Sequence, residues 1–217
     1  ERYDIKNDDD LKELINVVAS TVGSLTNPAK LENSFKSIKK STISDDTIKS
    51  YLEMFQDAFL IEKSVRYDIR GKKYISTPAK YYFEDLGLRN ARLNFRQVEE
   101  GHLMENLIYN ELRMRGYSVD VGQVETFEKN SEGKTIRKNF EVDFVCNLGA
   151  KRLYIQSALD MPTPEKVVQE SNSLLRVNDS FQKMIIVGGL APSYINDEGI
   201  IIMNIIDFLT KPDNLNI

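Results

Sequence analysis

Cysteine and histidine are almost absent, since the 217 residues include only Cys146 and His102. One cysteine excludes an internal disulfide, and without a cluster of Cys and His residues a structural zinc site is excluded as well. A chain without disulfides is typical of a reducing, intracellular compartment, so we expect a cytoplasmic location. His102 lacks the partners of a catalytic triad, and Cys146 has no activating base near it in sequence. Both are assigned to structure, Cys146 as a small apolar core residue.

Long apolar runs are also missing. The isoleucine-rich segment at residues 199–206 is too short to cross a bilayer, and no signal peptide is visible. With 41% hydrophobic and 29% charged residues, the composition is that of a globular protein, neither disordered nor fibrous. Because the chain starts on a charged segment at Glu1 rather than at a methionine, we expect it to be a piece of a longer protein.

A strong excess of charge of one sign is missing too, since the formal net charge is -4. Residues 27–80 carry eleven Lys or Arg against seven Asp or Glu, whereas residues 93–217 carry thirteen against eighteen. The N-terminal part is therefore mildly basic and could contact a phosphate backbone. Its excess is far below that of a dedicated nucleic-acid-binding protein.

The first part of the chain predicts three short helices followed by two short strands. Asp8 to Asp10 form an acidic cap for a helix over residues 11–22, where apolar residues recur at helical spacing. Pro28 opens a second helix, and Ser44 caps a third. This order is typical of a winged helix-turn-helix. The strands of its wing are predicted at residues 59–61 and 73–78.

In a winged helix the third helix usually enters the major groove, while the wing touches the backbone. Here the third helix opens with Asp45 and Asp46, which suit its dipole but would face the phosphates. The alternative to nucleic-acid binding is that the basic residues only form a solvated surface and that the winged helix packs against a partner domain. The predicted nucleic-acid contacts are Lys39, Lys40, Lys49, Arg66, Arg70, Lys72 and Lys73.

A second domain with a mixed sheet is predicted after an aromatic connector at residues 81–90. Two of its strands are predicted to be buried, and one of them is a near-continuous apolar run, which is typical of strands buried on both faces. The fold class is α+β, with a winged helix and connector at residues 1–92 and an α/β domain at residues 93–217. The predicted elements of that domain are helices at residues 101–115 and 164–175 and strands at 117–127, 140–145, 153–158, 184–187 and 200–203.

The stretch with the clearest chemistry is the predicted hairpin of residues 140–158, two strand-forming runs around a short turn that contains glycine. Successive side chains of a strand point to opposite faces, so Glu141 and Asp143 share one face, and Gln156 joins them in the simplest register. Two carboxylates beside an amide carbonyl suit a hard cation such as Mg²⁺. The alternative is a solvated face without a site.

Short motifs lie in order along nearly the whole chain, at residues 57–61 (DAFLI), 80–83 (KYYF), 87–90 (GLRN), 105–112 (ENLIYNEL), 141–145 (EVDFV) and 154–156 (YIQ). Their succession resembles the C-terminal half of a large bacterial and archaeal family of AAA+ ATPases. In that family a P-loop ATPase domain precedes a winged helix and a domain resembling the PD-(D/E)XK nucleases. The chain has no Gly-x-x-x-x-Gly-Lys-Ser/Thr motif, so ATP would bind only in a missing upstream domain.

The nuclease fold that the second domain resembles takes one acid from its first helix and one from its central strand. The next strand supplies an acid or Gln and a Lys. The resemblance assigns the catalytic and metal-binding positions to Glu105, Asp143 and Gln156, which would hold one or two Mg²⁺ ions that activate water. The lysine position falls on Ala158, which has no amine, although Lys138 on the neighbouring strand could supply one. We therefore expect a nuclease-like domain that has lost catalysis.

The leading interpretation is a C-terminal region that binds nucleic acid or a partner and is coupled to the absent ATPase domain. One alternative is an active Mg²⁺-dependent DNA nuclease that uses Glu105, Asp143 and Gln156. The other is a protein-interaction scaffold. The expected partners are nucleic acid and the upstream AAA+ domain of the same chain, and no membrane contact is expected.

Overall fold

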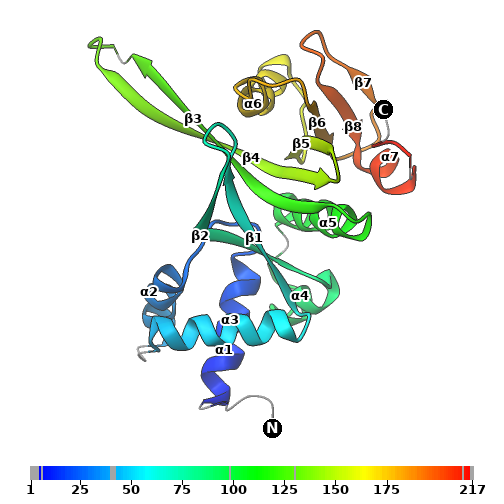
Figure 1. Cartoon of the computed structure of the whole chain (residues 1–217). Coiled ribbons are helices and arrows are strands. Elements are labelled where there is room, and N and C mark those ends of the chain that lie inside the picture. The colour runs from blue at the N-terminus through cyan, green and yellow to red at the C-terminus, as the bar shows by residue number, and fades with distance from the viewer. Residues whose placement is uncertain are drawn as a thin grey trace. The chain divides into compact units, whose positions relative to one another are not determined.

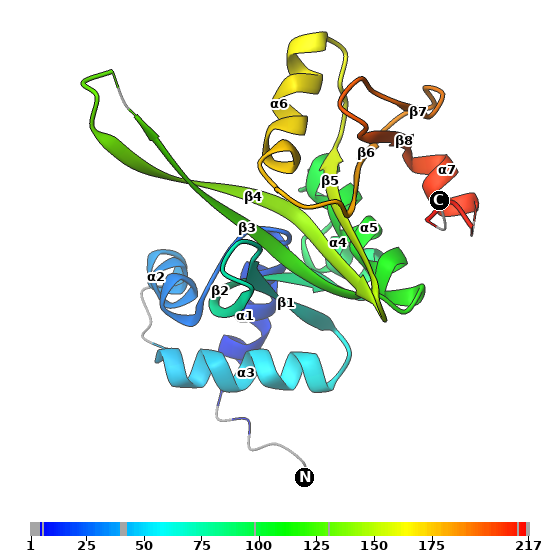
Figure 2. The same cartoon turned by 45° about the horizontal axis from the view of Figure 1, so that its top comes forward.

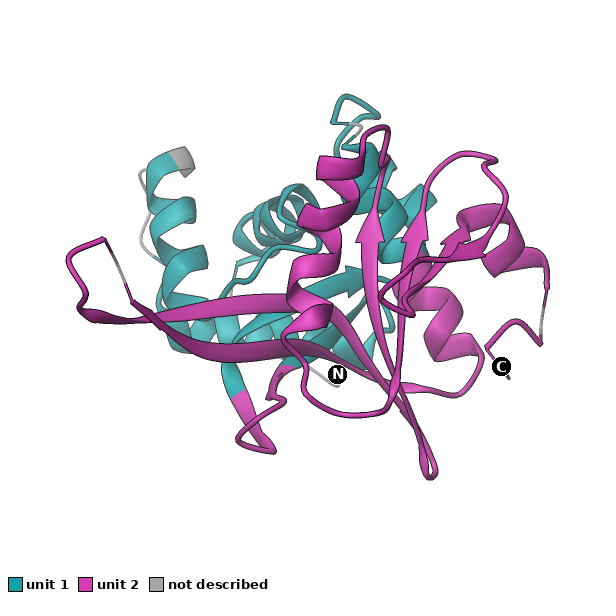
Figure 3. Ribbon diagram, turned by 90° about the horizontal axis from the view of Figure 1, so that it is seen from above, with its two compact units in different colours: residues 1–65, 76–107 teal, residues 66–75, 108–217 magenta. Residues whose placement is uncertain are grey.

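The computed structural model describes residues 5, 7–39, 43–97, 99–129, 131–211 and 213–215, with only the backbone at residues 38 and 39. The chain divides into two compact units, which Figure 3 shows in different colours. The first unit comprises Glu1–Val65 and Ser76–Leu107, and the second comprises Arg66–Ile75 and Ile108–Ile217. The sequence predicts a single boundary near residue 93, whereas the chain passes between the units at three points.

The described residues form one mixed sheet of eight strands in the order β2-β1-β3-β4-β5-β6-β8-β7. Strand β4 is antiparallel to β3 and β5, and β7 is antiparallel to β8, while the pairs β1–β3, β5–β6 and β6–β8 are parallel. The α+β class and the mixed sheet are confirmed. The strands are β1 (Ile61–Asp68), β2 (Lys73–Phe83), β3 (Ser118–Lys129), β4 (Thr135–Leu148), β5 (Lys151–Ala158), β6 (Gln182–Val187), β7 (Tyr194–Ile195) and β8 (Ile201–Asn204).

The pairing of β1 with β3 explains why residues 66–75 belong to the second unit. Arg66 lies opposite Val121 and Asp68 lies opposite Gln123, so the end of β1 joins the sheet of the C-terminal half. The sequence predicts a two-stranded wing that belongs to the helical part alone. The outer end of that hairpin is instead a part of the main sheet.

Helices dominate the first unit, and the caps of two of them can be compared with the sequence. Asn7 caps α1 because its Oδ1 accepts the backbone N–H groups of Asp9 and Asp10, so the predicted cap at Asp8 to Asp10 is wrong and these acids form the first turn. Ser44 caps α3, as predicted. No helix of the described residues is long and apolar enough to cross a membrane. The helices of this unit are α1 (Asp8–Ser20), α2 (Pro28–Lys39), α3 (Asp45–Asp57), α4 (Leu86–Arg92) and the first half of α5 (Glu100–Met114).

The core of the first unit lies between its helices and the strands. The segment that links α1 to α2 contributes to it, because Thr26 forms an antiparallel bridge with Ala79 of β2. Apolar residues at helical spacing bury one face of each helix. Core side chains that are at most 2% exposed include Leu14, Val18, Leu31, Phe35, Ile48 and Leu52.

The central hairpin is confirmed, since β4 and β5 pair antiparallel with Phe144 opposite Ile155. The connector predicted at residues 81–90 is wrong, because β2 continues to Phe83 and α4 follows it, capped by Asp85. Strand β7 and helix α7 (Ile205–Thr210) are not predicted. Elements of two and six residues are too short to show a hydrophobic period.

Helices cover both faces of the central strands in the second unit. The ring centroid of Tyr109, in α5, lies 6.5 Å from that of Phe144 in β4. Val145, the next residue, belongs to a buried cluster that contains Leu174 of α6 (Pro164–Leu175). Because successive strand residues point to opposite faces, α5 and α6 cover opposite faces of β4.

Strands β3 and β4 continue beyond the rest of the sheet as a long twisted ribbon (Figures 1 and 2). Ion pairs cross this ribbon between Glu125 and Arg137 and between Glu128 and Lys138. Arg176, which follows α6, also reaches Glu128 at 2.8 Å. Because exposed ion pairs contribute little stability, the backbone hydrogen bonds between the two strands must hold most of the ribbon.

Gly122 marks a very close approach between β3 and β4. A Cβ at this position would lie 2.8 Å from Cβ of Val142 and 3.0 Å from Cδ1 of Ile69, so packed atoms would have to move. We expect Gly122→Ala to lower the free energy of urea unfolding by about 1–3 kcal/mol. Gly101→Ala is the control, because nothing lies within 4 Å of a Cβ there and alanine favours the helix. Equal stability of the two variants would contradict this expectation.

Candidate functional site

Glu105, the first acid of the predicted nuclease site, is buried in the first unit and is 8% exposed. Its Oε1 accepts a hydrogen bond from the Tyr82 hydroxyl at 2.6 Å and lies 2.8 Å from Nζ of Lys80, which is 3% exposed. Gly23, whose φ is +71°, leaves room for this carboxylate, since a Cβ would lie 3.3 Å from both of its oxygens. Burial makes the pair interdependent, because either charge alone would be costly at this depth.

Asn106, the next residue of α5, makes a second connection to β2. Its Oδ1 accepts the N–H of Phe83 and its Nδ2 donates to the C=O of Phe83, both at 2.8 Å. Lys80, Tyr82, Glu105 and Asn106 are each at most 8% exposed, and we call these four residues the β2–α5 clamp. The clamp joins segments that are more than twenty residues apart in sequence, and all of it lies within the first unit.

Asp143, the second acid, lies in the second unit at an irregularity of β4. The register with β3 shifts here, so that Asp143 and Phe144 together oppose a single residue of β3, as in a β-bulge. The bulge interrupts the alternation on which the sequence prediction depends. Glu141 is exposed, whereas Asp143 is 7% exposed and its Oδ2 accepts the backbone N–H of Ser157 at 2.8 Å.

Gln156 lies beside Asp143 in the second unit. Its Oε1 accepts the backbone N–H of Asp143 at 3.4 Å and the hydroxyl of Ser173 at 3.2 Å. The pairing of β4 with β5 therefore brings these two predicted site residues together. Ala158, at the position of the missing lysine, is 4% exposed and belongs to the hydrophobic cluster that contains Leu174.

These residues do not fit the Mg²⁺ site that the nuclease resemblance implies. Mg²⁺ requires oxygen ligands with available lone pairs, and Oε1 of Glu105 already accepts an ammonium and a phenol. Lys138, the substitute amine, pairs with Glu128 on the ribbon at 2.7 Å. Within the part of the chain that the structure describes, no group of three or more His, Cys, Asp or Glu residues could hold a metal ion.

The predicted nucleic-acid contacts differ in their surroundings. Lys40 and the side chain of Lys39 lie outside the described residues. Lys49 is exposed on α3, whereas Arg66 is half-buried and donates to Oε1 of Gln123 at 2.9 Å. The other three predicted contacts are exposed, and none forms an ion pair with a described carboxylate: Arg70, Lys72 and Lys73.

Aromatic rings lie beside these cations in the second unit. Tyr74 is 64% exposed, and its ring centroid is 5.2 Å from that of Tyr67. The guanidinium of Arg152 lies 5.1 Å from the Tyr67 ring and 5.6 Å from the ring of Phe181. Four of these side chains, including that of Lys72, line a cavity of about 340 Å³. We call the following set the basic-aromatic surface: Tyr67, Arg70, Lys72, Lys73, Tyr74, Arg152 and Phe181.

Sequence reasoning found three cations of this surface and missed its rings. Tyr67 and Tyr74 stand among the basic residues of β1 and β2, a local signal for nucleic-acid binding that could have been used. Arg152 and Phe181 carry no such signal. Only the parallel pairing of β5 with β6 places them near each other, because Leu153 lies opposite Gln182.

Two buried groups of the second unit have raised pKa values. Burial raises the pKa of the Asp120 carboxyl, although a hydrogen bond from Tyr74 and the charge of Arg152 oppose this rise. Burial also raises the pKa of the Cys146 thiol, which is fully buried. A thiol in this state is a poor nucleophile, so Cys146 is an apolar core residue, as predicted.

Similarity to known proteins covers the chain without naming an activity. The family described as a domain of unknown function, DUF8612, matches residues 2–99. An uncharacterized protein of Haemophilus influenzae is 34% identical over 210 residues, which are 97% of this chain and 48% of that protein. An uncharacterized protein of Methanocaldococcus jannaschii is 30% identical over 166 residues, 76% of this chain and 34% of that protein. No solved structure matches significantly. The chain thus spans about half the length of these curated relatives, or less.

The β2–α5 clamp predicts a large effect of removing one buried charge. Lys80→Met leaves the Glu105 carboxylate buried without its cation, so we expect the free energy of unfolding to fall by about 3 kcal/mol or more. The control is Lys12→Met, which removes an exposed lysine that pairs with Asp8 and should cost far less stability. Urea unfolding followed by circular dichroism measures both. Similar losses in the two variants would show that the buried ion pair stabilises the chain no more than an exposed one.

Proposed function

We propose that the chain is the nucleic-acid-binding region of a longer protein and that the basic-aromatic surface contacts single strands. Binding of single strands without sequence preference combines cations that meet the phosphates with rings on which bases stack. Arg70, Lys72 and Lys73 supply charge that no described carboxylate neutralises. Tyr74 and Phe181 supply rings that are 64% and 41% exposed. This juxtaposition of unpaired cations and exposed rings is the observation that carries the proposal.

The position of Arg152 in the basic-aromatic surface adds to this argument. Arg152 lies over the rings of Tyr67 and Phe181, and its Nε donates to Oδ1 of Asn147 at 2.7 Å. Its position is therefore set before any ligand arrives, which limits the entropy lost on binding. A base entering the cavity of about 340 Å³ would meet ring faces and a guanidinium plane that are already in place.

Helix α3 has no part in this contact. Its exposed residues include Asp45, Asp46, Glu53 and Asp57 against one cation, Lys49, so it would repel a phosphate backbone. We retain the winged helix-turn-helix as the fold of the first unit, supported by three helices, the bridge to β2 and the β1–β2 hairpin. The acidic face of α3 favours a second role, the binding of a protein partner with a basic surface.

We infer that residues 93–217 follow the element order of a PD-(D/E)XK nuclease and have lost catalysis. Ala158 cannot replace the lysine, and Glu105 is held by the β2–α5 clamp. By the resemblance, the longer protein is an AAA+ ATPase whose P-loop domain and ATP site lie outside these 217 residues. The relatives, of which the chain spans 48% and 34%, support a longer protein.

The test of nucleic-acid binding is fluorescence anisotropy with a labelled oligothymidine at several salt concentrations. We expect salt-sensitive binding, because each phosphate contact releases counterions. We expect the triple variant with Gln in place of Arg70, Lys72 and Lys73 to make three fewer phosphate contacts. The plot of log affinity against log salt should then be less steep by about 2, since each contact contributes roughly 0.7 to the steepness. Tyr74→Ala should weaken binding by about 1–3 kcal/mol without a comparable change of slope.

The matched control removes three cations that are already paired with carboxylates on their own helix turns. Lys12 pairs with Asp8, Lys36 pairs with Glu32, and Lys211 pairs with Asp207. The variant with Gln at these three lysines loses the same charge and should bind like the parent chain. Equal losses in the two triple variants, or no salt-sensitive binding by the parent, would overturn the proposal.

The nuclease alternative has its own test, the nicking of supercoiled plasmid by the purified chain with Mg²⁺ or Mn²⁺. We expect no nicking above the level of an Asp143→Ala variant, because one oxygen of each acid already accepts hydrogen bonds and the lysine is missing. Cleavage that needs the divalent ion and disappears in Asp143→Ala would establish an active nuclease instead.

A further inference from the structure

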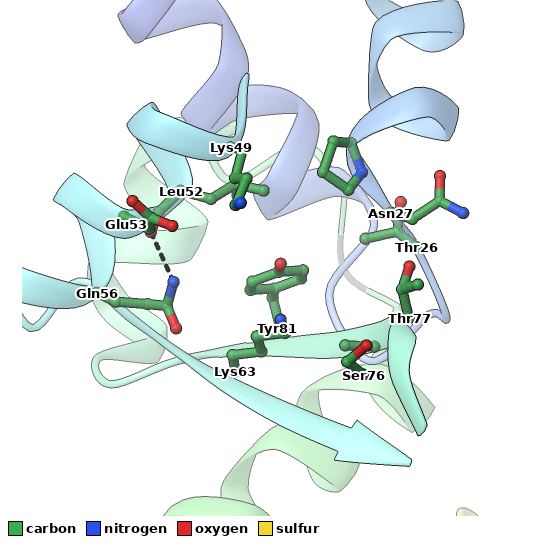
Figure 4. A pocket seen from close by; sticks show the side chains of 12 residues that line it. Thr26, Asn27, Lys49, Leu52, Glu53, Gln56, Lys63, Ser76, Thr77 and Tyr81 are labelled. Atoms are coloured by element: carbon green, nitrogen blue, oxygen red, sulfur yellow. Dashed lines mark hydrogen bonds between the residues drawn. The ribbon is translucent and has the colours of Figure 1, made fainter. Parts of the chain in front are cut away.

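A cavity of about 390 Å³ lies within the first unit, and its lining shares no residue with the basic-aromatic surface (Figure 4). Helix α3 forms one wall, and strands β1 and β2 form the wall opposite it. The start of α2 closes a third side with Asn27 and Pro28. Ligand pockets in proteins range from about 300 to 1,000 Å³, so this volume suits a molecule smaller than a typical drug.

The floor of the cavity is buried and contains the phenol of Tyr81, whose hydroxyl faces the cavity. Leu52, Ala79 and Tyr81 line it and are 2%, 2% and 6% exposed. The Tyr81 hydroxyl points toward α3 in Figure 4, and no hydrogen bond joins it to another described side chain. Burial, with a smaller effect of the Glu53 charge, raises the pKa of Tyr81 to about 12. The hydroxyl therefore keeps its proton at neutral pH and is available as a donor.

The rim of the cavity is polar and carries an excess of positive charge. Lys49 of α3 and Lys63 of β1 line it, and neither forms an ion pair with a described carboxylate. The one acid of the lining is Glu53. Ser76 and Thr77 of β2 add hydroxyl groups, so a ligand in the cavity meets both charge and hydrogen-bonding groups.

We propose that this cavity binds a small organic anion that carries a carboxylate or a phosphate. The anionic group pairs with Lys49 and Lys63, and an oxygen of the ligand accepts the hydrogen bond of the Tyr81 hydroxyl. Two unpaired cations against one carboxylate disfavour a cationic ligand, and the charged rim disfavours an apolar one. The Tyr81 hydroxyl faces the cavity, so a ligand oxygen can accept its hydrogen bond in place of water.

The test is a titration of the isotope-labelled chain followed by the chemical shifts of its backbone amides. Citrate tests a carboxylate, glucose 6-phosphate tests a phosphate, and glucose is the neutral match of the second. We expect saturable shifts with at least one of the anions at the amides of Thr26, Gln56, Ser76 and Tyr81. Glucose should cause none, and the amides of Val168 and Ile195, which lie in the second unit outside the basic-aromatic surface, should not move.

Three variants distinguish the cavity from an unspecific effect of charge. Tyr81→Phe removes only an unpartnered hydroxyl, so the chain keeps its fold, and the affinity should fall about three- to tenfold. Lys63→Gln should weaken binding by at least as much. Lys36 lies outside the cavity, so Lys36→Gln should have no effect.

The proposal is overturned if neither anion gives saturable shifts or if glucose gives the same shifts as its phosphate. Shifts confined to the basic-aromatic surface, or an unchanged affinity of Tyr81→Phe, would overturn it as well. The two sites lie in different units and share no residue. Failure here therefore leaves the single-strand proposal intact, and the anisotropy measurements do not decide the outcome for the cavity.

Discussion

The buried contact between Lys80 and Glu105 is the constraint on which the first unit depends. The residues of the β2–α5 clamp come from two of the motifs that resemble the AAA+ family, KYYF and ENLIYNEL. A third motif, GLRN, supplies Arg89, which is fully buried and donates to the C=O groups of Ala19 and Gln97. Burial lowers the pKa of this guanidinium, and the charge of Glu99 opposes the shift. The motifs therefore mark the places where separate segments are held together.

This view changes how the carboxylates of the chain are interpreted. When only the residue types are known, an acid on a helix and an acid on a strand suggest a metal site. In the structure Glu105 satisfies a buried ammonium, and Asp143 accepts a backbone N–H of the neighbouring strand. In contrast, five exposed cations form no ion pair with a described carboxylate: Arg70, Lys72 and Lys73 of the basic-aromatic surface, and Lys49 and Lys63 of the cavity beside α3. The two binding proposals depend on these cations.

Local signals predicted most elements, and non-local contacts account for what was missed. Ser44 and Pro28 mark helix starts by their own chemistry, and the predicted helix at residues 164–175 has the bounds of α6. The pairing of β1 with β3 was not predictable, because nothing in either strand specifies a partner more than fifty residues away. The bulge at Asp143 and the burial of Glu105 against Lys80 were not predictable for the same reason. Alternation and spacing describe one element at a time, whereas these features depend on two.

The most direct test of the clamp is a double-mutant cycle with Lys80→Met, Glu105→Leu and the combined variant, each measured by urea unfolding. If the two charges stabilise each other in the core, each single change leaves one charge unpaired, and the combined change leaves none. We predict that the combined loss of stability is smaller than the sum of the single losses by about 1–3 kcal/mol. Losses that add within about 0.5 kcal/mol would contradict this account and return Glu105 to the list of candidate metal ligands.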